Sequence, residues 1–389
     1  MSNFNQRATF TFPVPVYYGC GVLDELGERL GQLGCKRPLV VSGPSVAGAG
    51  LVDRAMEPIS KIGIEATLFL DAGLNPSEKD VYRGVECFRQ GNADSIVAIG
   101  GGSRIDLAKA IRLMVSHPGS LSSYYFDVGG VERIRKPMPP LVAIPTTAGS
   151  GSEVSRGAII TDSEQNRKRL IAGPGITASA AILDPELTTS MSPSLTATAG
   201  VDALSHALET FVGTSFHPLV EGISCRAAEL ILSDLELVVA DGNDLDRKGK
   251  ILLASTMAAM GFAKGLGVVH ALAHQLTPIH NISHGLAIAI ILPHGMRYNL
   301  TAATESYADL SRKIGVGDSG DDRTAAECLI DAVSKLVQRV GLPTTLRDVG
   351  VSLPRIEVLA RQAMLDHCVR TNPRPCTLED MERILQEAA

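Results

Sequence analysis

The sequence predicts an α/β domain with a doubly wound parallel sheet over residues 1–187 and an all-helical domain over residues 188–389. In the first part, short β-rich runs alternate with helical patterns, which is typical of a parallel sheet covered by helices. In the second part, apolar residues recur at three- and four-residue spacing and almost no strand pattern is present. A chain of 389 residues also exceeds one typical core, which favours two domains.

Four apolar runs in the first part have the length and composition of buried strands. They lie at residues 38–43, 66–73, 95–103 and 140–153, the last two ending in glycine-rich or polar turns. Helical patterns follow near residues 50–62, at 77–90 and directly after the third strand. Ser77 and Asp80 have the spacing of a capping box at the start of the second of these helices.

Five segments of the second part have helical periodicity and are separated by glycine and proline. They lie at residues 196–213, 220–240, 247–265, 324–341 and 378–389. Because these residue patterns alternate with turn signals and not with strands, we expect a domain built from packed helices.

Composition narrows the class of protein. The net charge of −6 provides no basic surface for a nucleic-acid backbone, so we expect no nucleic-acid partner. Seven cysteines without CxxC spacing indicate reduced thiols. The N-terminal residues lack the apolar segment of a secretory signal, and the longest apolar run, residues 286–293, is short for a bilayer span. We therefore expect a cytoplasmic protein without a membrane partner.

The first candidate nucleotide-binding loop follows the third strand. Gly101, Gly102 and Ser103 stand where this strand meets a helix, and such a turn lets a backbone approach a pyrophosphate at the helix N-terminus. Asp106, in the first helical turn, would either cap the helix or bond a polar part of the cofactor. The run is not a GxGxxG fingerprint, so a simple tight turn explains it equally well.

A second polar loop follows the fourth strand. Thr146, Thr147 and Ser150 offer hydroxyl groups among glycines, which suits phosphate or ribose contacts. Alone this loop is nonspecific. Because ligands of such sheets bind beyond the carboxyl ends of the strands, two such loops at one sheet edge together favour a dinucleotide.

The end of the first predicted strand bears on the choice of dinucleotide. NAD-specific enzymes usually place a carboxylate at such a strand end, where it bonds the ribose 2′-hydroxyl and repels a 2′-phosphate. Here the residues are Ser42 and Gly43, and no arginine in this stretch is placed to bind that phosphate. We therefore expect NADP or NAD to be accepted with a preference for NADPH, and Ser42 is a candidate phosphate donor.

Histidines point to a metal site in the second part. Five of the nine lie between Gly265 and Gly295, namely His270, His274, His280, His284 and His294. Upstream, Asp202 and His206 stand four residues apart on a predicted helix and therefore share one face. One carboxylate with several imidazoles suits Fe²⁺, or Zn²⁺ as the alternative ion. A substrate site needs an open coordination position, so not all of these groups can be ligands. His280 and His294 flank predicted turns, where capped or surface imidazoles are common.

The motifs identify a family. GGGSRIDLAK, IPTTAGSGSEVS, GVDALSHALE, the HALAH…SHG…LPHGMRYN run and TNPRPCTLEDMERIL together resemble the iron-containing (group III) alcohol dehydrogenases over essentially the whole chain. The resemblance implies a Rossmann-like N-terminal domain, a helical C-terminal domain and a homodimer or larger homo-oligomer. It implies that the metal ligands are Asp202, His206, His270 and His284. It also implies cofactor contacts from Gly43, Gly101, Gly102, Ser103, Asp106, Thr146, Thr147 and Ser150.

The function implied is metal-dependent, NAD(P)-linked hydride transfer between nicotinamide and a small primary alcohol, diol or aldehyde. His274, implied to be an active-site residue that does not bind the metal, stands one turn from His270 and is the candidate for relaying the alcohol proton to water. Gln275 and Ser283 depart from the family pattern near the expected pocket, so the substrate of any one relative does not transfer directly.

Three alternatives remain open. A 4-hydroxybutyrate-type hydroxyacid dehydrogenase would need a cation such as Arg156, Lys264 or Arg370 for the substrate carboxylate. A dehydroquinate-synthase-like lyase would need several cations around a polyanionic substrate, and the metal segments here contain almost none. A non-catalytic metal-binding protein would have no use for two phosphate-suited loops.

Overall fold

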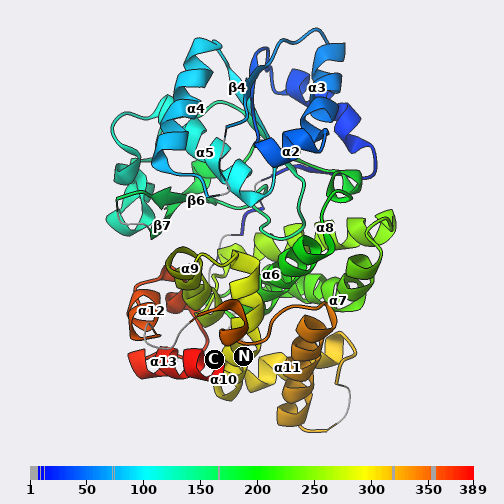
Figure 1. Ribbon diagram of the computed structural model, residues 1–389, viewed down its shortest axis with the longest axis vertical. Helices are drawn as coiled ribbons and strands as arrows, with labels where there is room; N and C mark the ends of the chain where they lie inside the picture. The colour runs from blue at the N-terminus through cyan, green and yellow to red at the C-terminus, as the bar shows by residue number, and fades with distance from the viewer. Residues whose placement is uncertain are drawn as a thin grey trace. The chain divides into compact units, whose positions relative to one another are not determined.

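The structure is a computed structural model that describes residues 8, 10–12, 14–71, 73, 75–164, 167–317, 320–351 and 356–389. It contains two compact units (Figure 1). One is Phe12–Ser190, and the other contains Met191–Ala389 together with the described residues before Phe12. The first is built on a parallel sheet and the second is helical, which confirms the predicted fold class.

The first unit has a six-stranded parallel sheet with the strand order β1-β8-β5-β4-β2-β3. The strands are β1 (Val16–Tyr18), β2 (Pro38–Val41), β3 (Thr67–Phe69), β4 (Ser95–Gly100), β5 (Leu141–Pro145) and β8 (Ala180–Leu183). Gly100 at the end of β4 pairs with Pro145 at the end of β5. The two polar loops that follow these strands therefore leave the sheet at the same edge.

Helices cover both faces of this sheet. They are α1 (Leu26–Gln32), α2 (Pro44–Gly48), α3 (Leu51–Lys61), α4 (Glu78–Gln90) and α5 (Gly102–Ser116). Val41 of β2 belongs to one buried cluster with Ile111 of α5, while its neighbour Val40 belongs to another with Ile59 of α3. Successive strand residues point to opposite faces, so both faces of a central strand are apolar and buried. Figure 1 shows α4 and α5 on one side of β4 and α2 and α3 on the other.

Four strands were not anticipated from the sequence. β1 and β8 are short strands added at one side of the sheet, where three- and four-residue runs carry too little periodicity to be recognised. β6 (Gly157–Asp162) and β7 (Arg167–Ala172) form a separate antiparallel pair. The strand expected at 66–73 is limited to β3, and residue 72 of that expectation lies outside the described residues.

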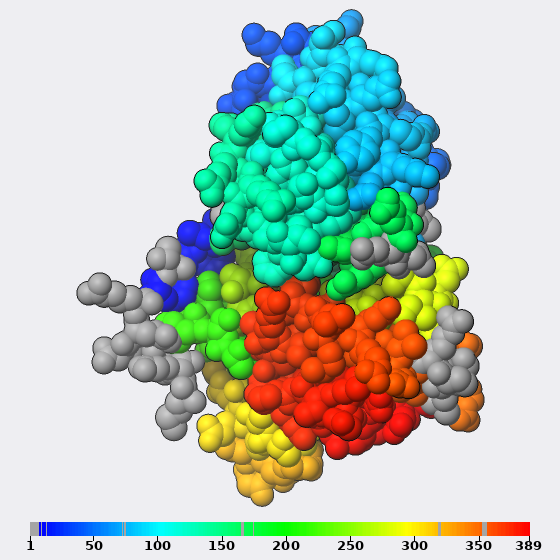
Figure 2. Space-filling model, turned by 90° about the vertical axis from the view of Figure 1, so that its left-hand side faces the viewer, coloured from blue at the N-terminus to red at the C-terminus, as the bar shows by residue number. Residues whose placement is uncertain are grey.

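The helical unit has eight α-helices within the described residues. They are α6 (Pro193–Val212), α7 (Pro218–Ala240), α8 (Leu245–Met260), α9 (Val268–His280), α10 (His284–Lys313), α11 (Asp322–Arg339), α12 (Ile356–Ala363) and α13 (Leu378–Glu387). Side chains define several starts: Ser192 accepts a hydrogen bond from the backbone of Leu195, and Thr377 forms a capping box with Asp380. Figure 2 shows the C-terminal segment with α12 and α13, in orange and red, as one continuous surface.

No single helix in the described part of the chain has the length and apolar composition needed to cross a membrane. The pair formed by residues 245–263 and 268–280, bent by 108°, satisfies the same criteria by length and composition only.

Candidate metal centre and cofactor-binding loops

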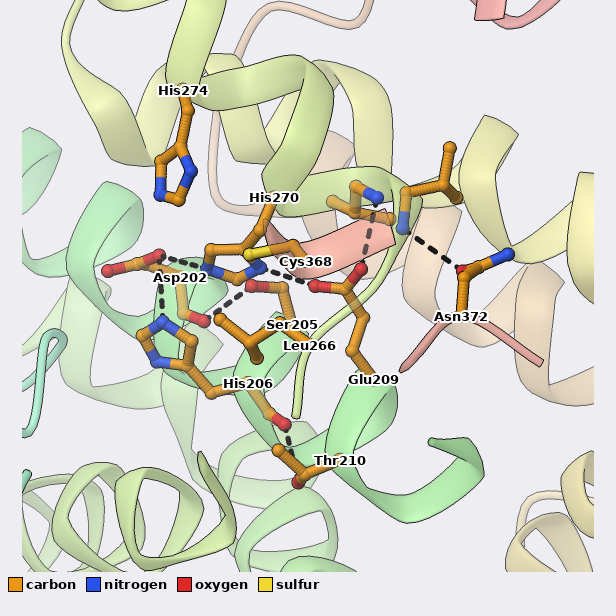
Figure 3. Close-up of polar contacts among 12 residues, drawn as sticks. Asp202, Ser205, His206, Glu209, Thr210, Leu266, His270, His274, Cys368 and Asn372 are labelled. Carbon is orange, nitrogen blue, oxygen red and sulfur yellow. Dashed lines mark hydrogen bonds and ion pairs between the residues drawn. The ribbon is translucent and has the colours of Figure 1, made fainter. Parts of the chain in front are cut away.

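The four side chains expected to bind a metal converge in the helical unit. Asp202 and His206 lie one turn apart on α6, His270 lies in the first turn of α9, and His284 is the first residue of α10. Oδ1 of Asp202 lies 3.6 Å from Nε2 of His206, 3.7 Å from Nε2 of His270 and 3.5 Å from Nε2 of His284. Figure 3 shows the rings of His206 and His270 directed at the Asp202 carboxylate.

These separations suit four ligands of one cation. Metal–nitrogen and metal–oxygen bonds of about 2.0–2.2 Å in a tetrahedral arrangement place neighbouring donor atoms about 3.3–3.6 Å apart. Oδ1 of Asp202 and Nε2 of His270 are buried and have no hydrogen-bond partner among the described residues. Buried polar atoms nearly always have a partner, so these two atoms fit a metal ion as the missing one. The donor set of three imidazoles and one carboxylate fits Fe²⁺ or Zn²⁺.

The charges at this site support cation binding. Burial alone would raise the pKa of Asp202, but His206, His284 and His270 hold it well below its usual range, so the group is a carboxylate. Burial alone would lower the pKa of His270, but Glu209 and Asp202 raise it to about 9. Because a metal and a proton compete for Nε2, both anions also favour a cation at this nitrogen.

Glu209 is a functional residue that the sequence reasoning missed. It lies on α6 one turn after His206, and its Oε2 makes a short hydrogen bond with Nδ1 of His270 (Figure 3). Its Oε1 accepts a hydrogen bond from the backbone N–H of Val269 at 3.0 Å. The carboxylate therefore holds the proton on Nδ1 and leaves Nε2 directed toward Asp202, as the partners of metal-binding histidines commonly do. The sequence contained one signal for Glu209: it lies seven residues, or about two helical turns, after Asp202.

Asn372 fixes the start of the same helix. Its Oδ1 accepts the backbone N–H of Val268 at 3.0 Å, and the amides of Asn372 and Asn299 exchange hydrogen bonds of 2.7 and 3.0 Å. Val268 and Val269 are the first residues of α9, where backbone N–H groups have no partner within the helix. Side chains from remote segments satisfy both groups and so hold His270 in place.

His274 lies beside the proposed ligands. Its ring stacks on that of His284 with a centroid separation of 5.4 Å, and its Nδ1 lies 2.9 Å from Oδ2 of Asp366. Burial would raise the pKa of Asp366, but His274 holds it well below its usual range. An ionised Asp366 accepts the Nδ1 proton, so Nε2 is the nitrogen that can exchange a proton.

His274, Asp366 and Cys368 form a second group whose donor atoms lie within 4.8 Å of one another. Burial and the Asp366 charge raise the pKa of the Cys368 thiol well above its ordinary value. His280 is the last residue of α9 and His294 lies inside α10, whereas the ion pairs of Asp202 given above join it to His206, His270 and His284.

The two polar loops of the α/β unit are in contact. The backbone N–H of Thr146 donates to the carbonyl of Gly100 at 3.1 Å. A Cβ atom at Gly102 would lie 2.4 Å from Oγ of Ser150, and one at Gly101 would lie 3.1 Å from Oγ1 of Thr147. Glycine at 102 is therefore required for this approach. The structure thus brings Gly101, Gly102, Ser103, Thr146, Thr147 and Ser150 to one edge of the sheet.

Asp106 and Lys109 of α5 form hydrogen bonds to the segment that follows the second polar loop. Oδ1 of Asp106 accepts the Ser152 hydroxyl at 2.5 Å, and Oδ2 accepts the backbone N–H of Ile159 at 3.0 Å. Nζ of Lys109 is buried and donates to the carbonyls of Ser152, Ser155 and Gly157 at 2.6, 3.0 and 2.7 Å. Burial lowers the pKa of Lys109 to about 8 although Asp106 acts in the opposite direction. Both Asp106 oxygens thus have protein partners, and its cofactor contact stays a prediction.

Ser42 and Gly43 follow β2. Ser42 is fully buried, and its hydroxyl donates to the carbonyl of Ile99 at 2.8 Å. A hydroxyl has one proton to donate, so in this arrangement Ser42 does not donate to a phosphate. Gly43 lies against the guanidinium of Arg104.

Comparisons with known proteins agree with this geometry. Residues 13–185 match the family model for iron-containing alcohol dehydrogenase, and residues 196–389 match the model for the C-terminal part of that family. The NAD-dependent methanol dehydrogenase of Bacillus methanolicus is 36% identical over 381 residues, covering 97% of this chain and 99% of the relative. The 4-hydroxybutyrate dehydrogenase of Cupriavidus necator is 35% identical over 382 residues, covering 96% of this chain and 97% of that relative. The crystal structure of a 1,3-propanediol oxidoreductase superposes with a TM-score of 0.95 at 35% identity, covering 98% of this chain and all of that chain.

The two family models cover nearly the whole chain, and both the fold and the metal-suited cluster agree with them. The resemblance drawn from the motifs is thereby confirmed, and so is the expectation of an alcohol dehydrogenase. The chain belongs to the iron-containing alcohol dehydrogenase family, whose members are oxidoreductases that act on CH–OH groups.

Proposed function

We propose that this enzyme transfers a hydride between a nicotinamide dinucleotide and a small primary alcohol, diol or aldehyde at a divalent metal bound by Asp202, His206, His270 and His284. The observation that carries the proposal is the set of 3.5–3.7 Å separations between Oδ1 of Asp202 and three imidazole nitrogens. When bound there, Fe²⁺ or Zn²⁺ would supply Lewis-acid polarisation of the substrate oxygen.

His274 is the proposed acid–base residue. Asp366 holds its Nδ1, and the ring lies beside that of ligand His284, so Nε2 can accept the alcohol proton and pass it to water. In the reducing direction the same nitrogen returns a proton to the product. Asp366 acts through His274 by orienting the ring.

For the cofactor we propose NADP as well as NAD, with a preference for NADPH. Gly101, Gly102, Ser103, Asp106, Thr146, Thr147 and Ser150 are the proposed contacts, together with Gly43. The support is the contact between the two loops and the absence of a carboxylate directly after β2 at residues 42–44. The methanol dehydrogenase relative is described as NAD-dependent, which supports use of NAD.

A second candidate substrate is a short hydroxyacid. The 4-hydroxybutyrate dehydrogenase relative favours it. Lys264 is unsuited to a substrate carboxylate because its buried Nζ already donates to the carbonyl of Phe211 at 2.7 Å and to Glu221 at 2.8 Å. Arg156 and Arg370 remain as the cations for such a substrate.

We further propose a cytoplasmic homodimer or larger homo-oligomer. The seven cysteines, all free, support a reducing compartment. The oligomer is supported by the family, whose members commonly associate. Size-exclusion chromatography with light scattering measures the subunit number directly.

Metal analysis of protein purified without air, followed by NADH and NADPH oxidation with short aldehydes and semialdehydes, tests the proposal. We expect about one Fe²⁺ or Zn²⁺ per chain. Asp202→Ala and His270→Ala should lose metal and turnover together. Full metal content and activity in both variants would refute the site.

A further inference from the structure

An arginine side chain occupies the space at the end of β2. Arg104 is the third residue of α5 and is 5% exposed. A Cβ atom built at Gly43 would lie 2.3 Å from its Nε and 2.6 Å from its Nη2. Gly43 lies two residues after the end of β2 and directly precedes α2. The guanidinium therefore fills the place that a side chain at position 43 would take.

The hydrogen-bonding capacity of this guanidinium is only partly used. Nη1 makes a short hydrogen bond to the carbonyl oxygen of Gly73. Nε is buried and has no partner among the residues that the structure describes. An arginine carries five N–H donors, and a buried donor without a partner costs free energy. Such a guanidinium is suited to an anion.

The surroundings indicate which anion. β2 and β4 are neighbours, with Val41 beside Ala98, so Gly43 and the glycine turn after β4 leave the sheet at the same edge. In dinucleotide-binding sheets the pyrophosphate lies at the glycine turn and the adenosine ribose near the next strand end. An acidic residue at that strand end selects NAD, whereas an arginine accommodates a 2′-phosphate. Here the position has Gly43, with the Arg104 guanidinium against it.

We propose that Arg104 binds the 2′-phosphate of NADP(H) and so sets the preference of this enzyme for the phosphorylated cofactor. The inference rests on the proposed function, because it places the adenosine end of the same cofactor. The absence of a side chain at Gly43 is equally necessary for this binding site, because any side chain at this position would displace the guanidinium from its present place. The arginine that was not found next to the strand in the sequence is supplied by α5.

The test measures binding of NADPH and NADH by fluorescence titration, together with 2′,5′-ADP and 5′-AMP as fragments that differ in the 2′-phosphate. In Arg104→Gln we expect NADPH and 2′,5′-ADP to bind about 10- to 100-fold more weakly, since a charge-assisted contact is lost. NADH and 5′-AMP should change by less than about threefold. Arg54→Gln is the matched control, because Arg54 is an exposed arginine of α3 that pairs with Glu186. It should leave all four affinities unchanged.

Gly43→Asp is the second variant and does not depend on how Arg104→Gln folds. Its carboxylate would pair with the guanidinium and repel the phosphate, so NADPH binding should weaken while NADH binding is retained. If Arg104→Gln weakens both nucleotides equally, Arg104 only anchors the Gly73 segment and the inference is wrong. If both nucleotides bind the wild type but neither variant changes their ratio, the inference also fails while the proposed function stands. If neither nucleotide binds the wild type, the proposed function itself fails.

Discussion

Replacing Glu209 with glutamine should weaken both metal binding and the fold, by amounts that two separate measurements can resolve. The carboxylate serves two donors at once, the Nδ1–H of His270 and the backbone N–H of Val269. Glutamine has the same size but one acceptor oxygen, so one of these buried donors loses its partner. The change also removes the charge that raises the pKa of His270, which makes that imidazole a weaker base and a weaker ligand.

Two magnitudes follow. Loss of such a supporting contact typically lowers metal affinity about 10- to 100-fold, which corresponds to about 1.4–2.7 kcal/mol. The unsatisfied donor costs about 1–3 kcal/mol of folding free energy. At about 2–4 °C per kcal/mol, the range for 150–250 residues, this corresponds to a fall of roughly 2–12 °C in Tm. Metal affinity is measured by competition with a chromophoric chelator, and Tm is measured on protein stripped of metal.

Asp234→Asn provides the matched control. Asp234 is a buried carboxylate of α7 that pairs with Arg247 at 2.6 Å, and it takes no part in the metal cluster. This variant should lose Tm and keep its metal affinity. The reasoning is refuted if Glu209→Gln binds metal within about twofold of the wild type while its Tm falls as in the control, because Glu209 would then support only the fold.

Three further predictions concern named residues. His274→Ala should keep its metal and slow turnover about 10²-fold, and full activity at unchanged metal content would remove the acid–base role. Asp366→Asn should move the pH dependence of kcat and leave metal affinity unchanged, because Asp366 contacts His274 and not Asp202; parallel pH–rate profiles and chelator titrations measure both. Lys109→Met should lower the free energy of unfolding by several kcal/mol, about 1–3 kcal/mol for each backbone carbonyl that loses its donor. Urea unfolding measures this loss. The folded pKa of Lys109 is about 8 against 10.5 as the unfolded reference, so between these values the unfolded chain binds more protons and this group adds stability as pH rises. The difference between wild type and Lys109→Met should therefore grow from pH 8 to pH 10, and a constant difference would contradict the burial effect.

The sequence was most informative where function depends on short-range spacing. Asp202 and His206 share a helix face because they are four residues apart, and a dense run of histidines nearby indicated a metal. Buried strands such as β4 and β5 were visible as apolar runs before glycine and hydroxyl residues. The three- and four-residue strands β1 and β8 were missed because so few residues carry no distinguishable period.

Contacts between remote positions could not be predicted in this way. Glu209 meets His270 across 61 positions, and Asp366 meets His274 across 92. Arg104 contacts Gly43, which is also 61 residues away in the sequence. The two come together because β2 and β4 are adjacent in the sheet although other elements separate them in the chain. Each of these contacts depends on tertiary packing, which local patterns do not encode. The convergence of the proposed ligands was therefore more predictable from the sequence than the contacts that orient them.

Two of the histidines of α9 show how one arrangement can serve two purposes. His270 and His274 lie one turn apart, and each has its Nδ1 held by a carboxylate from another segment, Glu209 or Asp366. Fixing Nδ1 makes Nε2 the active nitrogen in both rings, so their chemistry differs only through what faces that atom. Nε2 of His270 lies 3.7 Å from Oδ1 of Asp202 and belongs to the proposed ligand cluster, whereas the ring of His274 stacks on that of His284. In the proposed mechanism a helical turn of separation thus divides metal binding from proton transfer, which is why the Glu209 and Asp366 variants should affect different measurements.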